Sequence, residues 1–408
     1  MRTYRELFAA PEFTPLFLAS AGHVAGQTMS GLALGTLVHA ATGSPLLTAL
    51  AMFGPSLAQV LGATLLLSAA DRLPPRAAMT GLAVLFAAGT AVQALPGMPV
   101  WGTFAVLLVL GTVGALGGGV RYGLVNEVLP KDGYVLGRSL LNTCAGSMQI
   151  AGFALGGLLV VTLSARGTLL VGAGLYLLAA CAARFGLSRR PARAQGRPSV
   201  AQTWRTNSLL WSDRSRRRVY LALWLPNGLV VGAESLFVSY APSQAGALFA
   251  SAAGGMLLGD ILIGRFVPPA VRRRLGVPLL LLLATPYLLF ALNPSVPLAP
   301  ALAALASVGF AASLVQQERL MSLTPPELSG QALGLHSSGM LTMQGVAATL
   351  AGSLAQLTSP AAAITVMAVL SLTVTTVLAP GLRTAAGRRG GDPGPRPGLG
   401  VAPVSDKA

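Results

Sequence analysis

The chain is dominated by long apolar segments with few or no charged residues, which follow one another over most of its length. Each segment is long enough for the ~20 residues that an α-helix needs to cross a bilayer. We therefore predict membrane-crossing helices throughout the chain. The twelve expected spans are residues 14–40, 45–70, 77–97, 101–129, 137–163, 166–187, 218–241, 243–264, 274–293, 297–323, 331–357 and 360–380.

The composition points to the same class of protein. Of the 408 residues, 53% are hydrophobic and 10% are charged, whereas soluble domains carry about 25% charged residues. A soluble protein with so much apolar surface would precipitate, so the fold class is an all-α, polytopic membrane protein. Cys144 and Cys181 both fall inside spans and are interpreted as small packing residues, not as a disulfide.

The formal net charge of +16 is unevenly distributed along the chain. Lys and Arg that flank membrane helices concentrate on the cytoplasmic side. Among the odd-numbered turns only Arg166 is basic, whereas the even-numbered turns and both chain ends are rich in Arg and Lys. The pattern predicts a multi-pass protein of the plasma membrane with both termini in the cytoplasm. It makes the charge a mark of topology, so no nucleic-acid partner is expected.

An Arg- and Pro-rich segment divides the chain near its middle. It becomes amphipathic around Trp204 and Leu209, which predicts that part of it lies on the membrane surface. The expected organisation is a six-helix half at 1–187, a cytoplasmic linker at 188–217, a second six-helix half at 218–382 and a disordered, Gly/Pro-rich tail at 383–408.

The two halves repeat one another in sequence. Gln149 and Gln344 each follow a Met and are separated by 195 positions, and the same spacing separates Pro130 from Pro325. Landmarks that share one spacing predict two pseudo-symmetric six-helix halves.

Several motifs carry a family resemblance over residues 4–382. Asp71-Arg72 and Arg76, in a tight turn after the second span, resemble the acid–base turn of the major facilitator superfamily. Arg121 and Glu127 in the fourth span resemble its macrolide- and drug-efflux-like branch. Residues 152–157 resemble a fifth-helix motif of proton-coupled exporters, with Phe153 where that motif has proline.

The resemblance implies a secondary active transporter that works by alternating access. The favoured function is proton-coupled export of small amphipathic molecules by a monomer embedded in membrane lipid, with a proton gradient and no cofactor. A transporter-like scaffold or sensor without transport, and an importer or facilitator of the same superfamily, are the alternatives.

The Asp71 turn is expected to bias an inner gate. Its carboxylate can pair with a base or cap a neighbouring helix when the inner side is closed; the alternative is a solvated turn that only fixes topology. In the second half the matching position reads Gly264-Arg265, without the acid. Asp260, one helical turn earlier, either replaces it or pairs locally with Arg265.

Arg121 lies about two turns from the inner end of the fourth span. We expect it to form an inner-gate pair with Glu127 or with the opposing segment 316–319. Contact with an anionic substrate is the second interpretation.

Polar residues inside spans are functional candidates because exposing them to lipid is costly. A polar stripe on one face of the first span is expected to line a central cavity. Amides in the fifth, seventh and eleventh spans either line the same cavity or bond helices together. These candidates are Ser20, His23, Gln27 and Ser30 of the stripe, and Asn142, Gln149, Asn227 and Gln344.

Glu234 is the sharpest single candidate. It lies about 16 residues into the seventh span, roughly 24 Å from the inner surface at ~1.5 Å per residue, and Asn227 precedes it on the same face. Such a carboxylate suits proton coupling or binding of a cationic substrate. The alternative is a structural acid bonded to the first or eleventh helix.

No enzymatic signature is present in the sequence. The three histidines are scattered, without the spacing that holds a metal ion. No glycine-rich phosphate-binding loop ends in Lys-Ser or Lys-Thr. We therefore expect a carrier that has no catalytic residues, metal or cofactor.

Overall fold

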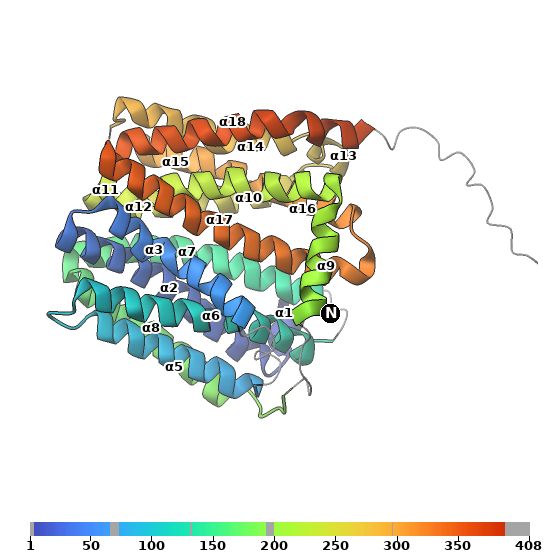
Figure 1. Cartoon of the computed structure of the whole chain (residues 1–408). Coiled ribbons are helices and arrows are strands. Elements are labelled where there is room, and N and C mark those ends of the chain that lie inside the picture. Colours follow the sequence, from blue (N-terminus) through green and yellow to red (C-terminus); the bar gives the residue numbers. More distant parts are fainter. Residues whose placement is uncertain (1–3, 66–72, 131–132, 193–199, 296, 388–408) are drawn as a thin grey trace, which may run out of the picture.

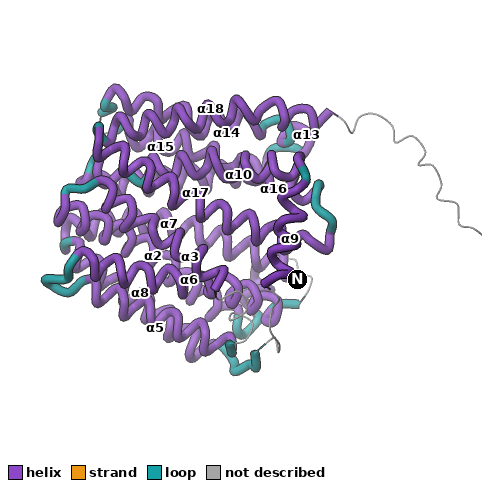
Figure 2. Tube along the Cα trace, viewed as in Figure 1, coloured by secondary structure: helices purple, strands orange, loops and turns teal. Residues whose placement is uncertain are grey.

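The computed structural model describes residues 4–65, 73–130, 133–192, 200–295 and 297–387, and within these ranges the chain forms helices and turns without a strand (Figure 2). The predicted all-α class is confirmed. The first half contains α1 (Tyr4–Ala9), α2 (Phe13–Thr42), α3 (Pro45–Leu65), α5 (Pro75–Gln93), α6 (Val100–Val128), α7 (Tyr134–Leu163) and α8 (Ala165–Gly186).

The rest of the chain contains more broken helices. Its elements are α9 (Val200–Ser212), α10 (Arg214–Glu234), α11 (Phe237–Tyr240), η1 (Pro242–Gln244), α12 (Ala245–Ile261), η2 (Leu262–Phe266), α13 (Pro269–Arg272), α14 (Gly276–Ala284), η3 (Thr285–Leu292), α15 (Leu298–Val308), η4 (Gly309–Ala311), α16 (Ala312–Ser322), η5 (Pro326–Leu328), α17 (Ser329–Leu357) and α18 (Pro360–Gly387).

These helices account for every predicted span. Among the described residues, nine helical stretches are long and apolar enough to cross a membrane, and a tenth, Gly276–Leu292, is apolar but shorter. The remaining two spans are α2 and α17, long helices of 30 and 29 residues that carry His, Gln and Ser side chains among their apolar residues.

The long helices lie side by side and run between two ends of the bundle (Figure 1). One end, here called the terminal face, holds the N-terminus, α9, α13 and the end of α18. The turns at residues 43–44, 94–99 and 358–359 lie at the other end, here called the opposite face. Apart from the turn before Arg166, the described turns that carry Arg lie on the terminal face, as the charge pattern predicts if that face is cytoplasmic.

Two helix pairs join the halves. α3 packs on α17, and α7 packs on α12. α3 and α12 are the second helices of their halves, and α7 and α17 the fifth, so the pseudo-symmetry exchanges the two contacts. This agrees with the predicted arrangement of two related six-helix halves.

The apolar core is continuous between the halves only toward the opposite face. There, Leu32 of α2 joins a cluster of second-half residues, and Phe53 and Phe153 of the first half pack against it. Toward the terminal face, one buried cluster consists of residues from 7 to 187 and another of residues from 219 to 382. Each of these clusters therefore stabilises one half alone.

Close backbone contacts seal the opposite face. A Cβ atom built on Gly157 of α7 would lie 2.7 Å from the Cα atom of Gly246 in α12. In the symmetry-related contact, a Cβ on Gly352 of α17 would lie 2.7 Å from the Cα of Leu46 in α3. Gly157 and Gly352 are separated by the same 195 positions as the sequence repeat. The repeat thus preserves the glycines that let the halves touch.

Two hydrogen bonds accompany this seal. The hydroxyl of Ser44, between α2 and α3, lies 2.7 Å from Oε1 of Gln356 in α17. Nδ1 of His39 in α2 lies 3.4 Å from the hydroxyl of Ser239 in α11. Both bonds link the first half to the second at the opposite face.

The helix α9 crosses the terminal face at a steep angle to the bundle (Figure 1) and packs on α10 and α17. Trp211 at its end stacks on Trp224 of α10, with ring centroids 5.4 Å apart. Trp204 and Leu209 are 67% and 56% exposed. α9 is therefore attached to the second half and presents an apolar surface outward; its placement on a membrane stays a prediction.

Parts of the second span, the Asp71 turn, the linker and the tail fall outside the described residues. Asp71 and Arg72 lie there, and so does most of the tail predicted at 383–408. The described start of that tail is helical, because α18 continues to Gly387. The predicted boundaries of the halves and linker stay predictions.

Enlarging Gly157 tests whether the glycine contacts close the opposite face. Gly157→Val adds a branched side chain against backbone, an overpacking that typically costs about 1–3 kcal/mol. In a protein with both native cysteines replaced, Ser44→Cys and Gln356→Cys are expected to cross-link readily, and Gly157→Val to reduce the yield. Gly174→Val is the control, because a Cβ at Gly174 meets no atom within 4 Å. Equal yields for both variants would contradict this account of the closure.

Candidate functional site

The polar stripe of α2 is divided between two environments. Gln27 is exposed, whereas Ser20 and Ser30 are buried. A Cβ on Gly26 would lie 3.2 Å from the backbone oxygen of Gly172 in α8, and one on Gly172 would meet the hydroxyl of Ser30. These glycines bring α8 close to α2, so Ser30 lies in a helix–helix contact. The expectation that the whole stripe lines a cavity is wrong.

His23 lies in an aromatic cluster and not on the exposed part of the stripe. Its ring centroid is 5.1 Å from that of Phe86 in α5 and 5.3 Å from that of Tyr176 in α8. Arg121 of α6 is close enough to act electrostatically on both His23 and Cys144 of α7. The cavity-facing interpretation of His23 is corrected: the imidazole joins α2 to α5 and α8, since its edge and face suit aromatic packing.

Glu127, the expected partner of Arg121, forms an ion pair that the sequence did not reveal. Its Oε2 lies 3.5 Å from Nε of Arg190, just after α8. Both terminal nitrogens of Arg190 also bind the carboxylate of Glu12, at 2.7 and 2.9 Å. Ser188 donates to Glu12 through its backbone N–H and its hydroxyl, at 3.1 and 2.9 Å. The start of the linker is thus fixed to the first half.

The electrostatics of Glu12 favour its ionised form. Partial burial acts to raise the pKa of this carboxyl, but the hydrogen bonds from Arg190 and Ser188 outweigh burial and lower the pKa below its usual value. Glu12 directly precedes α2. An isolated acid beside the first apolar span was the sequence signal that could have identified it.

The remaining gate candidates are separate from one another. Asp260 is half-buried in the last turn of α12, and Arg265 is exposed in the π-helical turn η2. Within the described ranges no ion pair joins them. Instead, the second half has a pair between Glu318 of α16 and Arg272 of α13, at 3.0 Å. Arg76 is half-buried in the first turn of α5.

Two of the predicted amides meet near the middle of the second half. Nε2 of Gln344 in α17 donates to Oδ1 of Asn227 in α10 at 3.2 Å. Gln149, the counterpart of Gln344 in α7, is half-buried and has no hydrogen-bond partner among the described residues. Asn142, two turns earlier on α7, is exposed. One half therefore uses its amide to join helices, and the other presents the equivalent amide for further bonding.

Glu234 lies inside the second half, away from the Asn227–Gln344 pair. It is 8% exposed, and its Oε1 accepts hydrogen bonds from the hydroxyls of Tyr287 in η3, at 2.9 Å, and Ser307 in α15, at 3.2 Å. The ninth and tenth spans supply these partners. The expected alternative, bonding to the first or eleventh helix, is therefore corrected, because α10 directs Glu234 toward η3 and α15.

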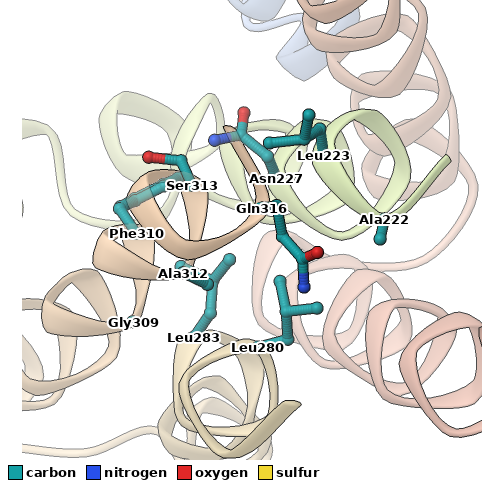
Figure 3. Close-up of a pocket in the computed structure, with 10 residues that line it drawn as sticks. All are labelled: Ala222, Leu223, Asn227, Leu280, Leu283, Gly309, Phe310, Ala312, Ser313 and Gln316. Atoms are coloured by element: carbon teal, nitrogen blue, oxygen red, sulfur yellow. The ribbon is translucent and has the colours of Figure 1, made fainter. Parts of the chain in front are cut away.

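A small cavity lies beside Asn227 and is lined by α10, α14 and α16 (Figure 3). Its volume of about 10 Å³ has room for one water molecule. The amide of Asn227, the hydroxyl of Ser313 and the amide of Gln316 point in different directions in Figure 3, so they do not form a shared binding centre. Over the residues that are described, no group of three His, Cys, Asp or Glu side chains could hold a metal ion.

Comparison with known proteins supports a transporter. The sequence profile of the Major Facilitator Superfamily matches residues 16–316. No curated protein matches the chain.

Solved transporters share the fold over nearly all of the chain. A POT family transporter in complex with 5-aminolevulinic acid is similar with a TM-score of 0.74 and 12% identity, over 91% of this chain and 96% of the other. The nucleoside transporter NupG gives 0.69 and 14%, over 90% and 99%. A bacterial homolog of the human lysosomal transporter Spinster, in an inward-facing and occupied conformation, gives 0.66 and 13%, over 95% and 97%.

Removing the Glu12 carboxylate is expected to destabilise the protein only when that group is ionised. Because the pKa of Glu12 is lowered in the folded state, its contribution is present above the unfolded value of about 4.3 and is lost as the pH falls through the folded value. Glu12→Gln should therefore cost about 1 kcal/mol near neutral pH and almost nothing in acid.

Thermal unfolding in detergent at a series of pH values measures this difference. Arg190→Gln should give a similar loss near neutral pH, whereas Glu327→Gln, at an exposed acid of η5, should give none. A Glu12→Gln deficit that persisted unchanged in acid would show that the lost stability does not come from the ionised carboxylate.

Proposed function

The chain belongs to the major facilitator superfamily, and we propose that it is a secondary active transporter that exports small amphipathic molecules across the plasma membrane by alternating access. In this proposal both termini are cytoplasmic, so the terminal face is the inner side. The chain would work as a monomer in the drug-efflux-like branch, driven by a proton gradient.

The distribution of contacts between the halves carries this proposal. Glycine contacts, hydrogen bonds and a shared core join the halves toward the opposite face, whereas the buried clusters toward the terminal face each stay within one half. Two halves whose backbone contacts and shared core lie toward one side can rock about a site between them, which is the motion that alternating access requires. The described conformation is then closed outside and open inside.

The proposed substrate contacts are the polar groups of central helices that the fold leaves available. Gln27 of α2 is exposed, and Gln149 of α7 is half-buried with its amide unbonded within the described part of the chain. A few such amides among aliphatic walls suit an amphipathic molecule held mainly by apolar contact. The similarity to a transporter crystallised with 5-aminolevulinic acid supports a small-molecule substrate.

The proposed coupling group is Glu234. As a carboxylate it can only accept hydrogen bonds, and it accepts them from Tyr287 and Ser307. A proton bound to Glu234 would add a donor and remove the buried charge, which changes how α10 packs on η3 and α15. Among the described residues no basic side chain pairs with Glu234, so its protonation breaks no ion pair there. Tyr287 and Ser307 thereby hold the carboxyl group that would bind the proton in one position inside the second half.

One observation favours the alternative of a scaffold or sensor without transport. Glu234 is enclosed by its own half and, among the described residues, makes no hydrogen bond to the amides of the central helices. A purely structural acid would look the same. Flux measurements separate the two functions.

Glu234→Gln is expected to uncouple transport from the proton gradient. A gradient of one pH unit supports up to about tenfold accumulation per proton, since 1.4 kcal/mol corresponds to a factor of ten; the variant should accumulate substrate little beyond equilibrium. The probe is an amphipathic dye, chosen because a drug-sensitive host does not retain it when the host expresses the chain. Accumulation of the dye is measured in inverted vesicles with the membrane potential clamped.

The matched control for this experiment is Glu327→Gln, which removes an exposed acid of the same half and should preserve pH-driven accumulation. Exchange of dye in the absence of a gradient should survive in Glu234→Gln. If Glu234→Gln accumulates the dye normally at every pH, the coupling role of Glu234 is wrong. If the unaltered chain moves no compound, the proposal of transport is wrong.

Gln149 and Gln344 are expected to respond differently to the same change. Gln149→Leu should raise the KM for the dye about tenfold, because it removes one hydrogen bond worth about 1–1.5 kcal/mol. It should have little effect on stability. Gln344→Leu removes the donor to Asn227 and should mainly lower the unfolding temperature. Dye flux and thermal unfolding of both variants test this, and the opposite pattern would exclude Gln149 as a substrate contact.

A further inference from the structure

A larger cavity opens in the second half, apart from the proposed transport path. Its volume is about 740 Å³, within the range of ligand sites. It lies toward the terminal face, and its walls come from the segment that starts with α13, from α14, α16 and the C-terminal part of α18. None of its lining residues belongs to the first half, so it is not part of a passage between the halves.

Basic side chains dominate the charge of this cavity. Arg273, Arg274 and Arg319 line it, and Glu318 is the carboxylate in its wall. Glu318 is held by Arg272, at 3.0 Å, which is outside the lining, and more loosely by Arg273, at 3.9 Å. Its negative charge is therefore offset without Arg274 or Arg319. These two guanidinium groups remain to attract an anion.

The N-terminus of α14 adds to the positive potential. Its first three residues, Gly276, Val277 and Pro278, line the cavity. The preceding residue, Leu275, offers no side-chain cap. The backbone N–H groups of Gly276 and Val277, since Pro278 has none, and the dipole at the helix start favour a negative group. Backbone and side chains thus act in the same direction.

A buried amide supplies a second and independent sign of a ligand. Gln316 lines the cavity and is only 3% exposed, yet its Oε1 has no hydrogen-bond partner in the described part of the chain. The amide lies against the start of α14, since a Cβ on Gly276 would be 3.1 Å from its Nε2. A buried acceptor is costly to leave unsatisfied, and a hydroxyl group would satisfy it.

We propose that this cavity binds a phosphate group carried by a hydroxyl-containing molecule of the glycerol phosphate type. Arg274 and Arg319 bind the phosphate oxygens, for which guanidinium groups are well shaped, and Gln316 accepts a hydrogen bond from a hydroxyl. Arg319 is already oriented, because it donates to the backbone oxygen of Leu382 in α18. Val315, Leu323 and Leu382 provide apolar walls that suit the glycerol backbone and the start of an acyl chain.

Two small anions test the recognition of phosphate and hydroxyl separately. At pH 8, methyl phosphate and glycerol 3-phosphate carry the same charge, and only glycerol 3-phosphate has hydroxyl donors. Binding to the full-length protein in a zwitterionic detergent is measured by titration calorimetry. We expect glycerol 3-phosphate to bind about tenfold more tightly than methyl phosphate. Gln316→Met should abolish that difference, and Arg274→Gln should weaken both anions about tenfold or more.

The matched control is Arg205→Gln, which removes one exposed arginine of α9 on the same face and should change neither affinity. Arg319→Gln, which removes the other proposed phosphate ligand, serves as a second variant if Arg274→Gln does not fold, as judged by gel filtration. Equal weakening by Arg205→Gln would show only a diffuse positive surface and would overturn the site. Absence of phosphate binding would overturn the proposal. A preference for glycerol 3-phosphate that survives Gln316→Met would overturn the proposed contact between Gln316 and the hydroxyl.

A lipid arm distinguishes the source of the phosphate. The protein is purified from mixed phosphatidylglycerol and phosphatidylcholine, and retained lipid is counted by native mass spectrometry. Retention of phosphatidylglycerol that Arg274→Gln abolishes and Arg205→Gln preserves supports a lipid headgroup. If only glycerol 3-phosphate responds to Arg274→Gln, the ligand is a soluble phosphate ester. Both outcomes support the site. If Arg274→Gln changes neither the retention of phosphatidylglycerol nor the binding of glycerol 3-phosphate, the site is excluded.

Discussion

The constraint on which the structure depends is that a bilayer offers no hydrogen bonds. Every backbone polar group in lipid must bond inside the protein, and the described spans meet this demand as helices joined by turns at the two ends of the bundle. The same constraint applies to side chains. Glu234 accepts two hydroxyl bonds within its half, Asn227 is paired with Gln344, and the Ser20 hydroxyl donates to the backbone of its own helix. Polar groups that escape this pairing, such as Gln27 and Gln149, then stand out as available for binding.

Helix contacts without a hydrophobic driving force rely on close packing, and small residues make it possible. Gly26 and Gly172 join α2 to α8 inside the first half, and Gly157 and Gly246 join α7 to α12 across the halves. The first contact turns part of the α2 stripe away from the centre, and the second closes the opposite face. Glycine placement thus determines both which polar residues are accessible and from which side.

The amino-acid sequence predicted the features that depend on local properties. Span length and apolarity are local, and the 195-residue repeat needs only a comparison of the chain with itself, so the helices and two-half arrangement were predictable. The partners of Glu234 were not, because Tyr287 and Ser307 lie 53 and 73 positions away. The stripe on α2 showed which residues share a face but not which neighbour covers it, so His23 was misplaced. Asp71 and Arg72, the strongest family motif, lie outside the described residues.

Two attachments set a limit on how far the halves can separate. Arg190 is bound to Glu12 and Glu127 of the first half, and Trp211 fastens α9 to Trp224 of the second. Only the nine residues from Pro191 to Ser199 connect Arg190 to the start of α9. At ~3.3–3.6 Å per residue, the ten steps from Arg190 to Val200 span at most about 35 Å when fully extended. The linker is therefore a short covalent connection, and its length limits how wide the terminal face can open.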